Sequence, residues 1–278
     1  MVTVRFDQNI PVAKTSDRII LLLLSVVYSA YRVYCKIILR VPRKMYYTAF
    51  VRKILPKRKF LLRSPANANI FLYCRAGHEM DNLILSNYED KVRFVFVPEP
   101  HDTIVDVGAH LGEYTIPCAK LATRVISIEP NVDVLEVLKE NIRVNALSNV
   151  VTVNKAVYDS HGYRSLNLFE DRTGMSSIVI DQYERKMKTL EVEADTLDNI
   201  LSVLQIDKVD WIKVDVEGAE VNVLRGAKRI ISSNLDNIRL IIECHSDETA
   251  KEVIRMITNF GMAFKMLDGH HIFAYHKN

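Results

Sequence analysis

The stretch TIVDVGAHLGEYTIPCAKLATRVISIEPN, residues 103–131, restricts the possible fold of this chain more than any other segment. A short apolar run rich in β-branched residues predicts a buried strand at 103–107, and a glycine turn follows it. Apolar periodicity then predicts a helix at 114–122, and a second buried strand at 125–128 ends in Glu129. A strand, a glycine turn, a helix and a second strand that ends in an acid together predict a nucleotide-binding βαβ unit.

The residues of the glycine turn indicate which nucleotide it suits. Gly108 and Gly112 are present, but the bulky His110 stands between them. A dinucleotide fingerprint needs a third glycine, because a pyrophosphate lies against bare backbone, so a nicotinamide-dependent oxidoreductase is disfavoured. Asp106 would repel a pyrophosphate, whereas it would attract the ammonium and sulfonium groups of S-adenosylmethionine. The turn therefore favours that cofactor, with Glu129 as acceptor for the ribose hydroxyls; a turn that only joins strand to helix is the alternative.

Charge divides the chain into a basic arm and an acidic remainder. The 278 residues carry a net charge of +3, yet residues 1–63 hold fourteen Lys or Arg and only two Asp or Glu. A hydrophobic content of 49% is that of an ordinary globular protein, and the length allows a large core. We expect a hydrophobic and basic helical arm at 1–63, a lead-in segment at 64–100 and the main domain at 101–278.

The arm predicts a helix at 18–40. Its longest uncharged stretch, 19–31, has thirteen residues, fewer than the roughly 20 that span a bilayer. Lys and Arg recur between residues 32 and 59, so we expect residues 18–63 to bind a membrane surface. Packing of this helix on the domain or on a second subunit is the alternative.

The cysteines indicate the compartment. Cys35, Cys74, Cys118 and Cys244 are widely separated and form no Cys-x-x-Cys pair. Scattered cysteines in apolar stretches are typical of buried free thiols in a reducing environment. We expect a cytoplasmic location, with attachment to the inner face of the membrane as an open alternative.

Strands alternate with helices through the rest of the chain. The lead-in predicts strands at 70–74 and 93–97 with a helical stretch at 80–86 between them. In the main domain, the sequence predicts helices at 132–145, 197–204, 217–231 and 248–260 and strands at 150–153, 209–215 and 239–243. It also predicts a β-excursion at 162–180, which includes a loop at 173–177. The chain closes with a predicted hairpin at 262–275, whose two-residue turn is Asp268-Gly269.

Acids and a histidine follow two of these strands. One strand ends at Asp215, with Glu217 close behind it, and the next ends in Glu243-Cys244-His245. Ligands of open α/β sheets bind outside the carboxyl ends of the strands, so we expect these side chains to meet near Gly108. Asp215, Glu217, Glu243 and His245 are the candidate catalytic bases, and His245 has the most suitable ordinary pKa. The spacing of the acids requires no metal, although they could hold Mg²⁺.

Two of these residues have structural alternatives. Glu220, in the first turn of the expected helix, could simply complement the helix dipole, which we weigh equally with a functional role. His245 could be a hydrogen-bonded structural histidine.

Four motifs, DVGAHLGEYT, ISIEPN, IKVDVEGAE and IIECH, resemble the FkbM family over about residues 100–245. The resemblance implies an α/β, Rossmann-like class I methyltransferase fold, with a mostly parallel seven-stranded sheet and a C-terminal antiparallel hairpin. It implies methyl transfer from S-adenosylmethionine to oxygen, commonly on sugars, glycolipids or related metabolites. It assigns the cofactor to Asp106, Gly108, Gly112 and Glu129, and His110 departs from the Asn usual in the family.

The remaining cofactor candidates come from neighbouring positions. Many methyltransferases read the adenine ring with an acid after the third strand, but Lys155 takes that position here. We therefore expect backbone groups near Ala156 to contact the adenine. Ala109, His110, Pro130 and Asp215 complete the candidate cofactor-binding set.

Two other functions stay open. IPCAK and ENIRVN are similar to the tRNA guanine methyltransferases, and a basic arm could bind phosphates. Against an RNA methyltransferase, the fourth strand carries Asp-Val-Glu-Gly instead of an Asn-Pro-Pro type motif, so we expect a small-molecule, glycan or glycolipid acceptor and no nucleic acid. A non-catalytic, membrane-tethered binding module is the second alternative, which the intact Asp106, Glu129 and Asp215 oppose.

Overall fold

The computed structural model describes residues 19–20, 23, 58–63, 70–75, 90–169 and 187–276. The chain divides into two compact units, 1–88 and 89–278. Of the helix expected at 18–40, only Ile19, Ile20 and Leu23 are described, and they are helical; Cys35 and the segments 80–86 and 173–177 lie outside the described residues. No helix in the described ranges is long and apolar enough to cross a bilayer. The membrane-surface role of the arm stays a prediction.

The first unit contains a two-stranded antiparallel sheet. β1 (Lys59–Arg63) pairs with β2 (Phe71–Arg75), in register from Lys59 opposite Arg75 to Arg63 opposite Phe71. The strand expected at 70–74 is confirmed, whereas the expectation of a helical arm up to residue 63 is wrong at its end. The apolar triplet Phe60-Leu61-Leu62 is buried, and β pairing satisfies its backbone groups.

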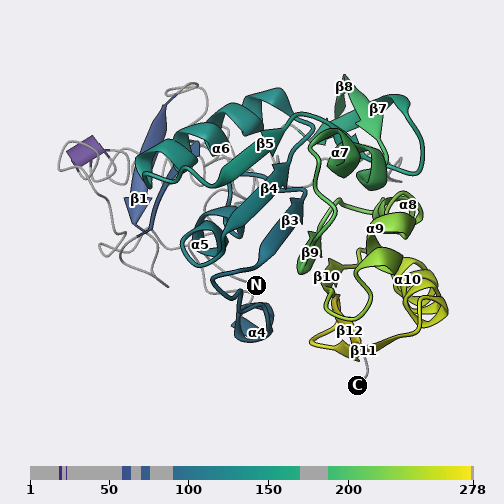
Figure 1. Cartoon of the computed structure of the whole chain (residues 1–278). Coiled ribbons are helices and arrows are strands. Elements are labelled where there is room, and N and C mark those ends of the chain that lie inside the picture. The colour runs from purple at the N-terminus through teal and green to yellow at the C-terminus, as the bar shows by residue number, and fades with distance from the viewer. Residues whose placement is uncertain are drawn as a thin grey trace, which may run out of the picture. The chain divides into compact units, whose positions relative to one another are not determined.

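The second unit is built on a seven-stranded sheet, which confirms the expected fold class (Figure 1). The strand order is β11-β12-β10-β9-β3-β4-β5, in which β5, β4, β3, β9 and β10 are mutually parallel and β12 is antiparallel to both neighbours. The strands are β3 (Thr103–Val107), β4 (Arg124–Ile128), β5 (Val150–Val153), β9 (Trp211–Val214), β10 (Arg239–Glu243), β11 (Met262–Met266) and β12 (His271–His276). The chain fills one half of the sheet from β3 outward and the other from β9, so these two strands form the topological switch point.

Helices cover both faces, because side chains of a strand alternate between them. Val105, Val107 and Val214 pack with α7 to α10, whereas Ile104 and Trp211 pack with α4 and α5. Figure 1 shows α8, α9 and α10 gathered on one side of β9 and β10. The helices are α4 (Asp90–Val95), α5 (Thr115–Ala119), α6 (Val132–Val144), α7 (Leu197–Val203), α8 (Glu220–Arg225), α9 (Lys228–Ser233) and α10 (Asp247–Asn259).

A three-stranded sheet, in the order β6-β8-β7, follows β5. It consists of β6 (Ala156–Val157), β7 (Gly162–Phe169) and β8 (Met187–Asp195). Its first long strand confirms the expected β-excursion up to Phe169. Beyond β8, Thr196 caps α7 by accepting a hydrogen bond from the backbone N–H of Asn199 at 3.1 Å.

The strand expected at 93–97 is wrong, because α4 occupies this segment. Val92 and Phe96 are buried, while Phe94 is 86% exposed. A spacing of four residues between the buried side chains suits a helix, and the apolar alternation that suggested a strand is incidental.

The helix expected at 217–231 is also wrong in its extent. It begins at Glu220 and divides into α8 and α9 around Gly226, whose carbonyl accepts the backbone N–H of Asp198 at 2.9 Å. The Asp198 carboxylate in turn accepts the backbone N–H groups of Arg229 and Ile230, at the start of α9. These contacts with α7 replace the hydrogen bonds of a continuous helix.

The hairpin between β11 and β12 is confirmed, but its two-residue turn is wrong. Leu267 donates its N–H to the carbonyl of His271 at 2.9 Å, which closes a wider loop. Asp268 stabilises this loop, because its carboxylate accepts the backbone N–H groups of His270 and His271, each at 2.8 Å.

The glycine turn after β3 is fixed by close packing. Gly108 has φ of +80°, and a Cβ there would overlap the carbonyl oxygen of Asp215, beyond the end of β9. Gly112 has φ of +94°, and its Cβ would lie 2.6 Å from Cδ1 of Leu138 in α6. Backbone conformation favours glycine at both positions, and the overlap with the Asp215 backbone additionally requires it at Gly108.

Replacing Gly108 with alanine should destabilise the fold by about 3 kcal/mol or more, because conformational strain and overlap with Asp215 act together. Gly261 offers a matched control: its φ is +79°, and its Cβ would have no described atom within 4 Å. Gly261→Ala should cost only about 1 kcal/mol, from strain alone. Urea unfolding of both variants measures the difference; equal losses would show that the contact with Asp215 contributes nothing.

Candidate active site

The predicted site residues meet at the carboxyl ends of the parallel strands. Gly108 follows β3, Glu129 follows β4, Asp215 follows β9, and Glu243 and His245 mark the end of β10. Because β3 and β9 are paired in register, the glycine turn and Asp215 adjoin each other. The structure thus brings the expected base candidates and the glycine turn to one edge of the sheet.

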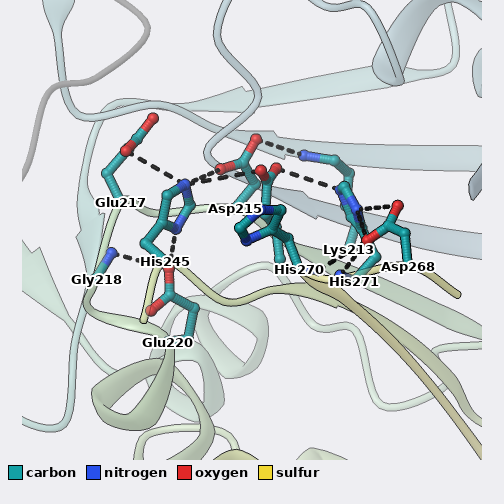
Figure 2. A network of polar contacts seen from close by, with 10 residues as sticks. Lys213, Asp215, Glu217, Gly218, Glu220, His245, Asp268, His270 and His271 are labelled. Atoms are coloured by element: carbon teal, nitrogen blue, oxygen red, sulfur yellow. Dashed lines mark hydrogen bonds and ion pairs between the residues drawn. The ribbon is translucent and has the colours of Figure 1, made fainter. Parts of the chain in front are cut away.

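His245 lies among four carboxylates (Figure 2). Its Nδ1 is 2.9 Å from Oε1 of Glu220. Its Nε2 is 3.2 Å from Glu217, 3.8 Å from Glu243 and 4.0 Å from Asp215. Three of the residues expected from sequence as bases, Asp215, Glu217 and Glu243, therefore surround one imidazole nitrogen of the fourth, His245.

Two other cations balance the same acids. Lys213 is buried, with its Nζ 3.2 Å from Oδ2 of Asp215 and 4.8 Å from the ring centroid of Tyr114. His271 places Nε2 3.4 Å from Glu243 and Nδ1 2.9 Å from Asp268. We call Lys213, Asp215, Glu217, Glu220, Glu243, His245, Asp268 and His271 the ionic cluster.

The ionic cluster shifts the pKa of its members. Burial raises the pKa of Glu217 to about 8, a shift that nearby Asp215 and Glu243 reinforce and His245 opposes. Burial alone would lower the pKa of His245, but the hydrogen bond to Glu220 and the charges of Glu217 and Asp215 raise it to about 9. Burial would raise the pKa of Asp215, but Lys213 and His245 hold it below its ordinary value. The edge therefore retains protons at neutral pH.

The turn between β9 and α8 has an unusual backbone. Glu217 has φ of 54° and Gly218 has φ of 108°, so two successive residues adopt left-handed conformations. The Gly218 N–H points to Oε1 of Glu220, at 2.8 Å. This turn directs the Glu217 carboxylate toward His245 (Figure 2).

The acid after β4 is held by the glycine turn. Glu129 accepts the backbone N–H of His110 at 3.0 Å and that of Asn131 at 2.9 Å. His110 itself has φ of 47°, which turns its N–H toward Glu129. The His110 backbone thus holds the Glu129 carboxylate, while the assignment of Ala109 and His110 to the cofactor stays a prediction.

Asp106 lies beneath the turn and is buried. Its Oδ2 accepts the Thr115 hydroxyl at 2.6 Å, and Thr115 also contacts the Ser127 hydroxyl at 2.7 Å. Its Oδ1 is buried with no hydrogen-bond partner among the described residues. Burial raises the pKa of Asp106, against the influence of Lys213. A buried acceptor of this kind suits a cationic or N–H-bearing ligand.

Pro130 and Ala156 lie at the ends of β4 and β5. The side chain of Asn154 ties this region together by donating to the carbonyls of Glu129 and Pro130, each at 2.9 Å. Lys155 turns away to pair with Glu193 at 2.6 Å and Asp195 at 3.1 Å. The residue in the usual adenine-reading position is thus occupied elsewhere, and Ala156 pairs with Ala194 in the small sheet.

Four members of the ionic cluster, Lys213, Glu220, Asp268 and His271, are not among the bases expected from sequence. Glu220 is expected equally as a helix-dipole residue, and Asp268 only as a turn residue. Lys213 precedes Asp215 by two residues on β9, so period-two alternation places both on one face and could have revealed it. His271 of β12 pairs in register with Glu243 of the neighbouring strand β10, which only the strand pairing shows.

Asp215, Glu217 and His245 also have the spacing of a metal site, with one potential ligand atom from each within 4.8 Å of the others. Lys213 and His245 already pair with these acids, so the geometry requires no metal. His161, Glu193 and Asp195 form a second such group, but Lys155 bridges its two acids.

Comparison with known proteins decides the family. The model of the methyltransferase FkbM domain matches residues 106–266, more than half of the chain. The chain belongs to the FkbM methyltransferase family. It is therefore an S-adenosylmethionine-dependent methyltransferase, and the expected resemblance, fold and cofactor are confirmed.

Individual relatives are distant. The chain is 26% identical over 176 residues to the hexuronic acid methyltransferase AglP of Haloferax volcanii, covering 63% of this chain and 69% of that protein. It is 27% identical over 153 residues to the methyltransferase sdnD of Sordaria araneosa, covering 44% of this chain and 59% of the relative. A crystal structure of an FkbM methyltransferase from Methylobacillus flagellatus aligns with a TM-score of 0.45 and 19% identity, over 66% of this chain and 45% of that one.

The shifted histidines predict how stability depends on pH. Burial would lower the pKa of His271, but the contacts with Glu243 and Asp268 raise it to about 9 from an ordinary 6.5. Between these values the folded state binds more protons than the unfolded state, so the free energy of unfolding should fall as pH rises. His245 and Glu217 act in the same direction.

In His271→Gln the free energy of unfolding should fall less steeply as pH rises. At pH 6.5, where the ion pairs of His271 are intact, it should be lower than in the wild type by about 1.5–3 kcal/mol. His101→Gln is the control, because its side chain is 68% exposed. Urea unfolding from pH 6 to 9.5 gives the comparison. A decline in H271Q as steep as in the wild type would contradict the assigned ion pairs.

Proposed function

We propose that this chain transfers a methyl group from S-adenosylmethionine to a hydroxyl oxygen of a sugar, in a glycan, a glycolipid or a related metabolite. The observation that carries the proposal is the convergence of Asp215, Glu217, Glu243 and His245 beside the glycine turn. An alcohol needs a base to take its proton as it attacks, and this edge of the sheet is rich in proton acceptors.

The glycine turn and its surroundings fit the cofactor. Asp106 offers a buried acceptor, Oδ1, that lacks a partner among the described residues, and Glu129 is oriented by two backbone N–H groups. We assign Glu129 to the ribose hydroxyls, Asp106 and the turn from Gly108 to Gly112 to the methionine end, and Pro130 and Ala156 to the adenine. When bound, S-adenosylmethionine supplies an electrophilic methyl group on a cationic sulfur, which the acids of this edge attract.

His245 is the base that this geometry favours. Its Nε2 faces the edge of the sheet, where an acceptor hydroxyl would displace the contact with Glu217. The side chain is 27% exposed, so an acceptor can reach it. Glu217, Asp215 and Glu243 then stabilise the imidazolium that forms, because each lies within 4.0 Å of the same nitrogen.

The sugar acceptor rests on the relatives. AglP is named a hexuronic acid methyltransferase and is similar to this chain over 176 residues. The strand that leads to Asp215 continues as Val216-Glu217-Gly218, and Glu217 is engaged with His245. This arrangement supports a hydroxyl acceptor over the RNA alternative.

The described cysteines support a reducing, cytoplasmic location. Cys118 and Cys244 are buried free thiols.

Removal of the Glu129 carboxylate should weaken binding of S-adenosylmethionine at least about tenfold, since the ribose loses a charged acceptor. Calorimetric titration of Glu129→Ala measures this. The control is Glu136→Ala, an exposed acid of α6 whose carboxylate pairs with Lys139. Equal affinity in wild type and E129A would remove Glu129 from the cofactor site, and no binding by the wild type would overturn the proposed function.

His245→Gln should lower methyl transfer by a factor of about 10²–10⁴ while the affinity for S-adenosylmethionine stays within about threefold, because a general base contributes that much. The assay uses methyl-labelled cofactor with glucuronate-containing oligosaccharides, a lipid and glycan extract, and total RNA as separate acceptors. Label recovered only in RNA would favour the nucleic-acid alternative, and near-normal turnover of H245Q would assign the base role to one of the acids.

A further inference from the structure

Glu220 is the most deeply buried acid of the ionic cluster. It is the first residue of α8 and its exposed fraction is 0%. Its Oε1 accepts the Gly218 N–H at 2.8 Å and lies 2.9 Å from Nδ1 of His245 (Figure 2). Its Oε2 is buried without a hydrogen-bond partner among the residues that the structure describes.

Asp215 and Glu243 have cationic partners besides His245, but among the described residues Glu220 does not. Asp215 pairs with Lys213, and Glu243 pairs with His271. Within the described ranges, the imidazole of His245 is the one cationic partner of Glu220. Burial of a carboxylate costs free energy unless it is paired, so Glu220 stabilises a proton on Nδ1 of His245.

The described neighbours of the imidazole fall into two groups, those that approach Nε2 and the one that contacts Nδ1. Asp215 and Glu217, which follow β9, and Glu243, at the end of β10, all approach Nε2. Glu220, from α8, alone contacts Nδ1 among the described groups, while Lys213 and His271 act through Asp215 and Glu243. Removing Glu220 therefore changes the nitrogen that faces away from the acceptor.

We propose that Glu220 is a positioning residue: it holds Nδ1–H of His245, so that Nε2 is the nitrogen presented to the acceptor hydroxyl. This inference rests on the proposed function and deepens it. A carboxylate that fixes the tautomer and ring orientation of a catalytic histidine serves the same purpose in hydrolases of unrelated fold.

The proton balance is simple. The raised pKa of His245, about 9, means that the Nε2 proton of the imidazolium must first leave to solvent. As the acceptor oxygen then forms its bond to the methyl carbon and the sulfur–carbon bond breaks, the hydroxyl proton moves to the free Nε2 of His245. The resulting imidazolium keeps its Nδ1–H bond to Glu220, whose carboxylate stays ionised. The proton leaves Nε2 to solvent after the methylated product departs.

A purely structural role would be that of a helix cap. Glu220 also accepts the Gly218 N–H at the start of α8, which stabilises that turn. A cap would affect thermal stability but not the titration of His245, so the experiment must read the histidine directly.

The test is long-range ¹H–¹⁵N NMR of the full chain labelled with ¹⁵N-histidine, titrated from pH 5 to 10 without ligand. The signals of His245 are assigned by their absence in H245Q. In Glu220→Gln the midpoint for His245 should fall by about one pH unit or more, and Nδ1–H should lose its dominance in the neutral form. Glu220→Asp, which keeps the charge on a shorter side chain, should shift the midpoint less.

Glu248→Gln is the matched control, because Glu248 is an exposed acid in the first turn of α10. It should leave the His245 titration unchanged. An unchanged His245 midpoint in folded E220Q would overturn the proposal. If E220Q does not fold, an unchanged midpoint in E220D overturns it equally.

Turnover with the oligosaccharide acceptor should fall at least about tenfold in E220Q while KM for S-adenosylmethionine stays within about threefold, with partial recovery in E220D. Failure of the proposed function is distinguishable, because the wild type would then transfer no label to the oligosaccharide acceptor. The NMR titration reads the Glu220–His245 contact in either case.

Discussion

The backbone of Gly108 lies against the carbonyl oxygen of Asp215, and the arrangement of the site depends on this contact. It joins the ends of β3 and β9, the two strands at which the sheet changes direction. A side chain on residue 108 would force the strand ends apart, and with them the glycine turn and the acids beyond β9. The same packing directs the N–H of His110 onto Glu129, so one close approach aligns three strand ends.

The acids gathered there are tolerated because cations are distributed among them. Lys213 pairs with Asp215, His271 with Glu243 and Asp268, and His245 with Glu217 and Glu220. Like charges this close would otherwise oppose folding, and burial makes the repulsion stronger. The protein meets this cost partly by keeping protons, as the raised pKa of Glu217 shows. The same ion pairs thus stabilise the fold and allow many proton acceptors to lie together at this edge of the sheet.

Sequence reasoning predicted the central sheet well, because its strands are short apolar runs with the β-branched residues that buried strands favour. The boundaries of Thr103–Val107, Val150–Val153 and Arg239–Glu243 agree with the structure residue for residue. It failed where tertiary contacts override local pattern: Asp198 divides the helix around Gly226, and Asp268 widens the hairpin loop.

The site was predictable in part for a related reason. Residues that follow a strand are placed by topology, which is why Asp215, Glu217, Glu243 and His245 could be expected together. The partners of those residues depend on side-chain contacts across the sheet. Alternation with Asp215 could place Lys213 at the site, whereas Glu220 and His271 are joined to it by such contacts alone.

The left-handed backbone conformation of Glu217 has an energetic consequence. For a residue other than glycine this conformation costs about 1–2 kcal/mol, which the contact with His245 helps to offset. The turn and the imidazole are therefore energetically interdependent: each holds the other in place. Any change at position 245 alters both a proton acceptor and the loop geometry, and kinetic effects there measure the two together.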